Sequence, residues 1–157
     1  DYYASRGLGD VYKRQCLLFM FSLPSSANTG NVTANTGIEY LSNGDYLETV
    51  ITQTFSTRSS LSGTKTTNYK NSAGSIMWSV SVNATFSYTY GKSSSCTSVN
   101  GSSASYSSAW SVSDATTSKS GNHATASATG YHYVAGILTD SLSRSVTLYC
   151  DSYGNLS

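Results

Sequence analysis

The clearest pattern in the chain is an alternation of apolar and polar residues in the stretch SIMWSVSVNATFSYTY, residues 75–90. Apart from Met77, its apolar members occupy even-numbered positions: Ile76, Trp78, Val80, Val82, Ala84, Phe86, Tyr88 and Tyr90. Successive side chains of a β-strand point to opposite faces of the sheet, so the pattern predicts a strand with one buried and one solvated face. At about 3.3 Å per residue this strand would approach 50 Å, and we expect it to bend or to break near Asn83.

Weaker alternation predicts strands on either side of this segment. Residues 45–57 are rich in β-branched side chains, and Asn43-Gly44 predicts a turn that joins them to residues 39–41. Residues 64–69 are expected to pair with the long strand across the turn-forming segment 70–74. The next expected strand carries four residues on one face: Ala104, Tyr106, Trp110 and Val112.

Two more strands are expected near the C-terminus. In residues 122–133 the small residues Ala124, Ala126 and Ala128 are in phase, whereas Tyr131 and Tyr133 have the opposite parity. A β-bulge at Gly130 would explain the change. The inner face of the last strand is expected to comprise Leu142, Val146, Leu148 and Cys150.

Together these segments predict an all-β fold. Helix-type periodicity is absent, and six to eight short strands separated by turn residues are typical of a single antiparallel β-sandwich, which we assign to residues 38–157. The residues expected to anchor its core are Trp78, Trp110, Phe86, Val80, Val146 and Leu148.

The N-terminal residues differ in composition from this domain. Residues 10–15, DVYKRQ, correspond to an in-frame translation of GATGTGTATAAGAGACAG, so we interpret residues 1–15 as a translated sequencing-library adapter. Residues 16–27 combine a short apolar run with Ser25-Ser26-Ala27, which is typical of the end of a signal peptide, and we expect cleavage after Ala27. Residues 28–37 are expected to form a flexible segment. The mature product is then expected to be secreted.

Charge narrows the range of partners. The net charge of +1 equals that of residues 1–15, because the six basic residues from Asn28 onward balance six acidic ones. A nucleic-acid surface needs clustered Lys and Arg, so we expect no nucleic-acid partner. No apolar run is long enough for a transmembrane helix.

Export bears on the state of the cysteines, because disulfides form in exported proteins. Without Cys16, the pair Cys96 and Cys150 remains, and an even pair in an exported chain predicts one disulfide. The chain lacks the C-x-x-C and H-x-x-x-H spacings of common metal sites, so we expect neither a metal nor another cofactor.

Five stretches of the sequence resemble a known group of proteins: GIEYLSNGDYLET, TRSSLSGTKTTNYKNSAGSIMWSVSV, CTS, AWSVSDATTSKSGNHATASATG and SVTLYCDSYGNLS. Over residues 37–157 the chain resembles short secreted proteins of Gram-positive gut anaerobes that carry a domain of unknown function. The resemblance implies export and a single domain, and it implies no catalytic residues.

Candidate catalytic residues are few. There is no G-x-S-x-G motif, and His123 and His132 would lie on opposite faces of one straight strand. Glu39, Glu48 and Asp114 could supply the carboxylate pair of a hydrolase, but no spacing selects them. We therefore expect no catalytic residues.

Non-catalytic binding is better supported. Tyrosines among hydroxyl-bearing residues suit glycan recognition, because aromatic rings stack on sugars and short side chains hydrogen-bond to them. Trp78 and Trp110 have core parity, which leaves Tyr131, Tyr133 and Tyr149 as candidate ligand-binding residues. The expected partner is a cell-wall glycan, a host glycan or a surface protein. An alternative is a membrane-active protein whose residues 76–90 enter the bilayer.

Overall fold

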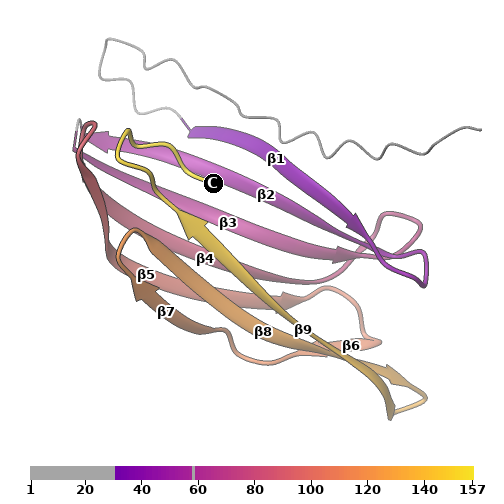
Figure 1. The fold of residues 1–157 in the computed structure, drawn as a ribbon. Coiled ribbons are helices and arrows are strands. Elements are labelled where there is room, and N and C mark those ends of the chain that lie inside the picture. Colours follow the sequence, from indigo (N-terminus) through magenta and orange to yellow (C-terminus); the bar gives the residue numbers. More distant parts are fainter. Residues whose placement is uncertain (1–30, 58) are drawn as a thin grey trace, which may run out of the picture.

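The computed structural model describes residues 31–57 and 59–157, which form nine β-strands in two antiparallel sheets (Figure 1). The expectations for residues 1–27 lie outside the described residues. The strands are β1 (Asn31–Tyr40), β2 (Tyr46–Thr57), β3 (Ser60–Lys70), β4 (Ile76–Thr89), β5 (Ser93–Ser105), β6 (Trp110–Val112), β7 (Thr116–Ser120), β8 (His123–Val134) and β9 (Ile137–Tyr149).

The first sheet is a meander with the order β1-β2-β3-β4-β5. The β1–β2 and β3–β4 connections are the turns expected from Asn43-Gly44 and residues 70–74, and Gly44 and Gly74 adopt φ of 88° and 86° there. Positive φ is readily reached only by glycine, which is why these turns are tight enough to keep neighbouring strands paired.

The second sheet is built around β8. Strand β9 pairs with β8 along its length, whereas β6 pairs with residues 130–132 and β7 with residues 123–127 of the same strand. Since a strand has two edges, β6 and β7 occupy in succession the edge that β9 does not. The two sheets stack as a sandwich, which confirms the predicted all-β sandwich, with nine strands in the described residues where six to eight were expected (Figure 1).

The core lies between the two sheets. The even-numbered face of β4 is buried as its alternation predicted, and the largest fully buried side chains include Trp78, Phe86, Leu61 and Leu148. Val80 and Val146 are buried as well, and Trp110 is half-buried against the same cluster. All six residues expected to anchor the core therefore lie in the core or at its margin.

Small residues on β8 allow the sheets to approach closely. Ala124, Ala126 and Ala128 are buried and face the first sheet, followed by Gly130. A Cβ atom on Gly130 would lie 2.4 Å from Cε2 of Trp78, so the indole occupies the space that a side chain would need. The run of alanines thus provides room for the larger residues of β4.

Strand β4 has no break near Asn83, where the sequence predicted either a bend or a break, and it ends one residue before the predicted end. Asn83 pairs with Thr64 on one side and with Asn100 on the other. The strand ends at Thr89, so Tyr90 belongs to a turn and is exposed instead of buried. Pairing on both edges stabilises the long strand, and the following Gly91 with φ of 69° reverses the chain.

Three other boundaries differ from the prediction. Ala104 and Trp110 belong to different sheets, because β5 ends at Ser105 and residues 106–109 cross to β6. The β8–β9 register shifts between His132 and Tyr133, beyond the bulge expected at Gly130. Residues 31–37, which we expected to be flexible, pair with β2 as part of β1. In each case strand pairing, and not the local residue pattern, determines the boundary.

The prediction of a disulfide between Cys96 and Cys150 is wrong. Cys96 and Cys150 are buried but are free thiols. Each Sγ is directed to a nearby backbone carbonyl, Cys96 to that of Ser98 at 3.3 Å and Cys150 to that of Asp151 at 3.4 Å. Each thiol therefore has a local hydrogen-bond acceptor in place of a covalent partner.

Within the part of the chain that the structure describes, no helix has the length and apolar character needed to cross a membrane.

Candidate functional site

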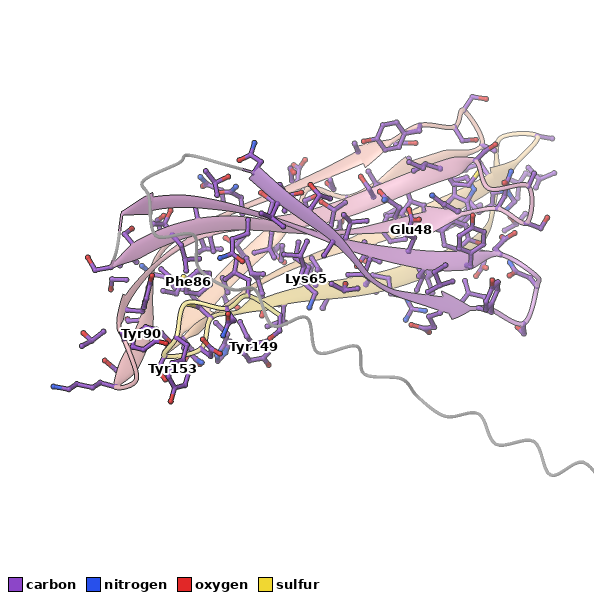
Figure 2. All side chains as sticks on the ribbon, turned by 90° about the horizontal axis from the view of Figure 1, so that it is seen from above. Glu48, Lys65, Phe86, Tyr90, Tyr149 and Tyr153 are labelled. Atoms are coloured by element: carbon purple, nitrogen blue, oxygen red, sulfur yellow. The ribbon has the colours of Figure 1, made fainter. Side chains whose placement is uncertain are left out.

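Three exposed tyrosines gather at one end of the sandwich (Figure 2). Tyr90, Tyr149 and Tyr153 are 64%, 45% and 49% exposed, and we call them the tyrosine cluster. The rings of Tyr90 and Tyr153 meet edge to face with their centroids 5.2 Å apart. Such an arrangement leaves ring faces accessible to a ligand, in contrast to the buried aromatic residues of the core.

Two turns bring Tyr90 and Tyr153 together. Tyr90 begins the β4–β5 turn, and the N–H of Gly91 donates a 2.9 Å hydrogen bond to the carbonyl of Ser152. This bond joins the β4–β5 turn to the C-terminal turn that carries Tyr153. The contact between Tyr90 and Tyr153 is therefore supported by a backbone hydrogen bond between the two turns as well as by the packing of the rings.

The C-terminal turn is closed by Asp151. Its Oδ1 accepts hydrogen bonds from the N–H groups of Tyr153 at 2.8 Å and Asn155 at 2.9 Å, and its Oδ2 accepts one from Nδ2 of Asn155 at 2.8 Å. Gly154 has φ of 82°, the left-handed conformation that favours glycine. These bonds fix the backbone of the turn that carries Tyr153.

The same turn is anchored to the first sheet. Nε2 of the buried Gln53 donates a 3.2 Å hydrogen bond to the Gly154 carbonyl. Leu156 packs so closely on β3 that a Cβ on Gly63 would lie 2.2 Å from its Cδ1. The tyrosine cluster thus stands on a fixed base, which lowers the conformational entropy that a ligand would have to remove.

Tyr149 lies at the end of β9. It is paired with His123, and the two rings are 5.2 Å apart. The imidazole can donate or accept a hydrogen bond beside the ring. The exposed Lys92 follows Tyr90 in the β4–β5 turn and adds a cationic donor to this end.

The structure separates the three tyrosines predicted from the sequence. Tyr149 pairs with residue 123 of β8, whereas Tyr131 and Tyr133 lie eight and ten residues further along that strand, at the opposite end. At about 3.3 Å per residue the separation is about 26 Å or more. Tyr90 and Tyr153 were not among the predicted residues, although both stand directly before a turn glycine, Gly91 and Gly154, which was the available signal.

A second aromatic group is largely buried at the opposite end. Tyr69 stacks on Trp78 at 6.1 Å and meets Trp110 at 4.9 Å, and Trp110 lies 4.9 Å from the ring of His132. Burial, together with the hydrogen bond that the Tyr69 hydroxyl donates to Asp45, raises the pKa of Tyr69 to about 12. The group therefore belongs to the core, and only its margin is open to solvent.

The residues considered for catalysis do not come together. His123 and His132 have opposite parity on β8, and the register shift lies beyond both. Glu39 pairs with Arg144 at 3.4 Å, whereas Glu48, on the opposite face of the first sheet, pairs with Lys70 at 2.6 Å. Asp114 lies beside a third surface, the outer face of the second sheet.

That outer face carries a ladder of hydroxyl groups. The pairs Thr125–Thr147, Ser127–Ser145 and Thr129–Ser143 are joined by hydrogen bonds of 2.8, 2.7 and 2.7 Å. A shallow pocket of about 270 Å³ lies over part of this ladder near Asp114 and Thr116. Because the hydroxyl groups bond to one another, we consider this surface a weaker candidate than the tyrosine cluster.

The thiols beneath the tyrosine cluster are poor nucleophiles. Burial raises the pKa of Cys96, and burial followed by the neighbouring Asp151 raises the pKa of Cys150 to about 11. Both thiols are consequently protonated near neutral pH, and the thiolate is the reactive and metal-binding form. Among the described residues no group of three or more His, Cys, Asp or Glu side chains is placed to hold a metal ion.

Comparison of the chain with protein families, curated proteins and solved structures finds no match.

Proposed function

We propose that this protein is a secreted, non-catalytic binding domain that recognises a glycan at a cell surface through the tyrosine cluster. The observation that supports this most strongly is the presence of three exposed tyrosine rings at one end, two of them in contact across turns that are distant in the sequence. Aromatic rings offer a large apolar face together with a polar hydroxyl, which suits the mixed apolar and polar faces of a sugar ring.

Hydrogen-bonding groups beside the rings support the same assignment. His123 lies against Tyr149, and Lys92 follows Tyr90. Glycan hydroxyls need such donors and acceptors, because a stacked sugar must replace the hydrogen bonds that it made to water. The fixed C-terminal turn favours binding for the same reason that any preorganised site does.

The proposal that the protein is secreted rests on the N-terminal sequence and on a resemblance to other proteins. The apolar residues 17–23 followed by Ser25-Ser26-Ala27 are typical of a signal peptide, and the resemblance to short secreted proteins of gut anaerobes has the same implication. A cell-wall or host glycan is then the partner within reach.

The proposal is tested by co-sedimentation of the protein with bacterial cell walls and insoluble polysaccharides. We expect Tyr90→Ala, Tyr149→Ala and Tyr153→Ala each to weaken retention by about fivefold to tenfold, the effect of one lost ring contact. Tyr106→Ala is the matched control, because Tyr106 is equally exposed but follows β5 at the opposite end.

The outcome also decides the location of the site. If Tyr131→Ala is the only substitution that lowers retention, the glycan site lies at the opposite end of the sandwich. Retention that no tyrosine substitution changes, or no retention on any glycan, would overturn the proposal.

A further inference from the structure

The hairpin that joins β8 to β9 projects beyond the rest of the second sheet (Figure 1). The ladder between β6 and β8 ends at the pair Trp110–His132, and a bond from the Tyr133 N–H to the Ala109 carbonyl is the last one beyond it. Past this point the hairpin is two-stranded. Ala135 and Gly136 close it with φ of 50° and 79°, the two positive values of a tight type I′ turn.

The tip of this hairpin is apolar on both faces. Tyr133 is opposite Leu138, and Val134 is opposite Ile137, so the two successive pairs point to opposite faces. Leu138, Val134 and Ile137 are 50%, 54% and 70% exposed, and Tyr133 is 36% exposed. We call these four residues the hairpin tip. Residues 133–139 contain no Asp, Glu, Lys or Arg.

We propose that the hairpin tip inserts into the interfacial region of a lipid bilayer. A folded partner that docks on a hairpin covers one face and leaves the other in water, whereas lipid surrounds both. Burial of apolar surface is the dominant favourable term in association, so side chains that are apolar on both faces are best accommodated by an apolar medium. This proposal concerns the end opposite the tyrosine cluster and does not depend on glycan binding.

The dimensions of the hairpin fit shallow insertion. From the Tyr133–Leu138 pair to the end of the turn the strands extend about 10 Å at about 3.3 Å per residue, and interfacial segments enter to about 5–10 Å. The next pair toward the sandwich, His132 and Asp140, is polar and would remain at the level of the headgroups. Tyr133 then lies where aromatic residues concentrate in membrane proteins.

The backbone limits the depth as well. The outer edges of a two-stranded hairpin carry N–H and C=O groups that are not paired within it. These groups would be costly in the hydrocarbon core but find water and headgroups at the interface. The hairpin tip therefore enters only the interfacial region and does not cross the bilayer.

The test compares the full chain with its Val134→Ser/Ile137→Ser variant in sedimentation with phosphatidylcholine vesicles. We expect the substitutions to lower the partition coefficient by about tenfold or more, because two exposed aliphatic side chains no longer enter the lipid. Ile38→Ser is the matched control: Ile38 is 50% exposed on β1 of the first sheet and is not part of the hairpin, so its loss should change partitioning less than about twofold.

The wild type and both variants contain the apolar residues 17–23, so these residues contribute equally to binding in all three proteins. A difference in partitioning between the wild type and the double variant is therefore due to the hairpin tip. Equal partitioning of the wild type and the double variant would overturn the proposal. Both substituted side chains are exposed, so the variant should retain the wild-type thermal midpoint.

A second measurement reports depth directly. Ile137→Trp should be quenched by phosphatidylcholine brominated along its chains, whereas Ile38→Trp should be quenched no more than the wild type, whose own indoles are Trp78 and Trp110. If Ile137→Trp behaves like Ile38→Trp, the hairpin does not enter the bilayer and a protein partner becomes the better assignment for its apolar tip.

Discussion

Trp78 and Gly130 are packed so closely that no side chain could be added between them. A Cβ on Gly130 would lie 2.4 Å from Cε2 and 2.6 Å from Nε1 of the buried indole. The contact joins β4 of the first sheet to β8 of the second and limits how near the two sheets come at this end of the sandwich.

Gly130→Ala should lower the free energy of unfolding by about 1–3 kcal/mol, the usual cost of overpacking a core. Chemical denaturation measures the change. Gly37→Ala is the control, because a Cβ there would meet nothing within 4 Å. If the close contact is the cause, adding Trp78→Phe should cost less in the alanine background than in the wild type. Additive effects would contradict this explanation.

Alkaline pH should destabilise the protein through buried acids that are protonated in the folded state. The pKa of Tyr69 is raised to about 12 from 10.0, and those of Tyr88, Cys96 and Cys150 are raised as well. A raised pKa contributes stability that is fully present below the unfolded value and is lost as pH rises through the folded value.

The urea midpoint should therefore be insensitive to these groups up to about pH 8 and should fall between about pH 8 and 12, first through the thiols and then through the tyrosines. Tyr69→Phe removes the largest tyrosine contribution, so its midpoint should decline less steeply between about pH 10 and 12. An identical decline in both proteins would show that Tyr69 titrates normally.

Alkylation should distinguish free thiols from a disulfide. In the absence of reductant, iodoacetamide should modify Cys96 and Cys150 slowly in the folded protein and completely after unfolding, because both are buried and protonated. Trypsin separates them into the peptides 93–119 and 145–157, which mass spectrometry resolves. A single cross-linked product of these two peptides would contradict the free-thiol state.

Lys65 should lower stability at neutral pH. It is paired with Ile51 and Val82 on the inner face of the first sheet, and burial lowers the pKa of its amine (Figure 2). Lys65→Met removes the cost of desolvating a charge, so we expect the free energy of unfolding to rise by up to about 1 kcal/mol, reduced by the remaining contact of the amine with solvent.

The sign of this effect can be checked with pH. Because the pKa of Lys65 is lowered on folding, the wild type gains stability as the pH rises through the folded value toward 10.5, and the advantage of the methionine variant should shrink over the same range. Lys92→Met, in an exposed turn, should change stability by less than about 0.5 kcal/mol. Equal effects at both positions would contradict burial as the cause.

The sequence by itself determined the local features of this protein. The alternation in residues 76–89 identifies β4 and its buried face, since the two-residue period of a strand is a property of neighbouring residues. Asn43-Gly44 locates the β1–β2 turn, since positive φ is a demand that single residues satisfy.

Only the tertiary structure decided which distant segments meet. The contact of Tyr90 with Tyr153, the assignment of Ala104 and Trp110 to different sheets and the separation of Tyr131 from Tyr149 depend on strand pairing across the whole chain. The same holds for the unpaired thiols and for the two-stranded hairpin beyond His132. Local patterns specify the face on which a side chain lies, whereas its neighbours across the sandwich depend on sheet order and register, which are set by long-range packing.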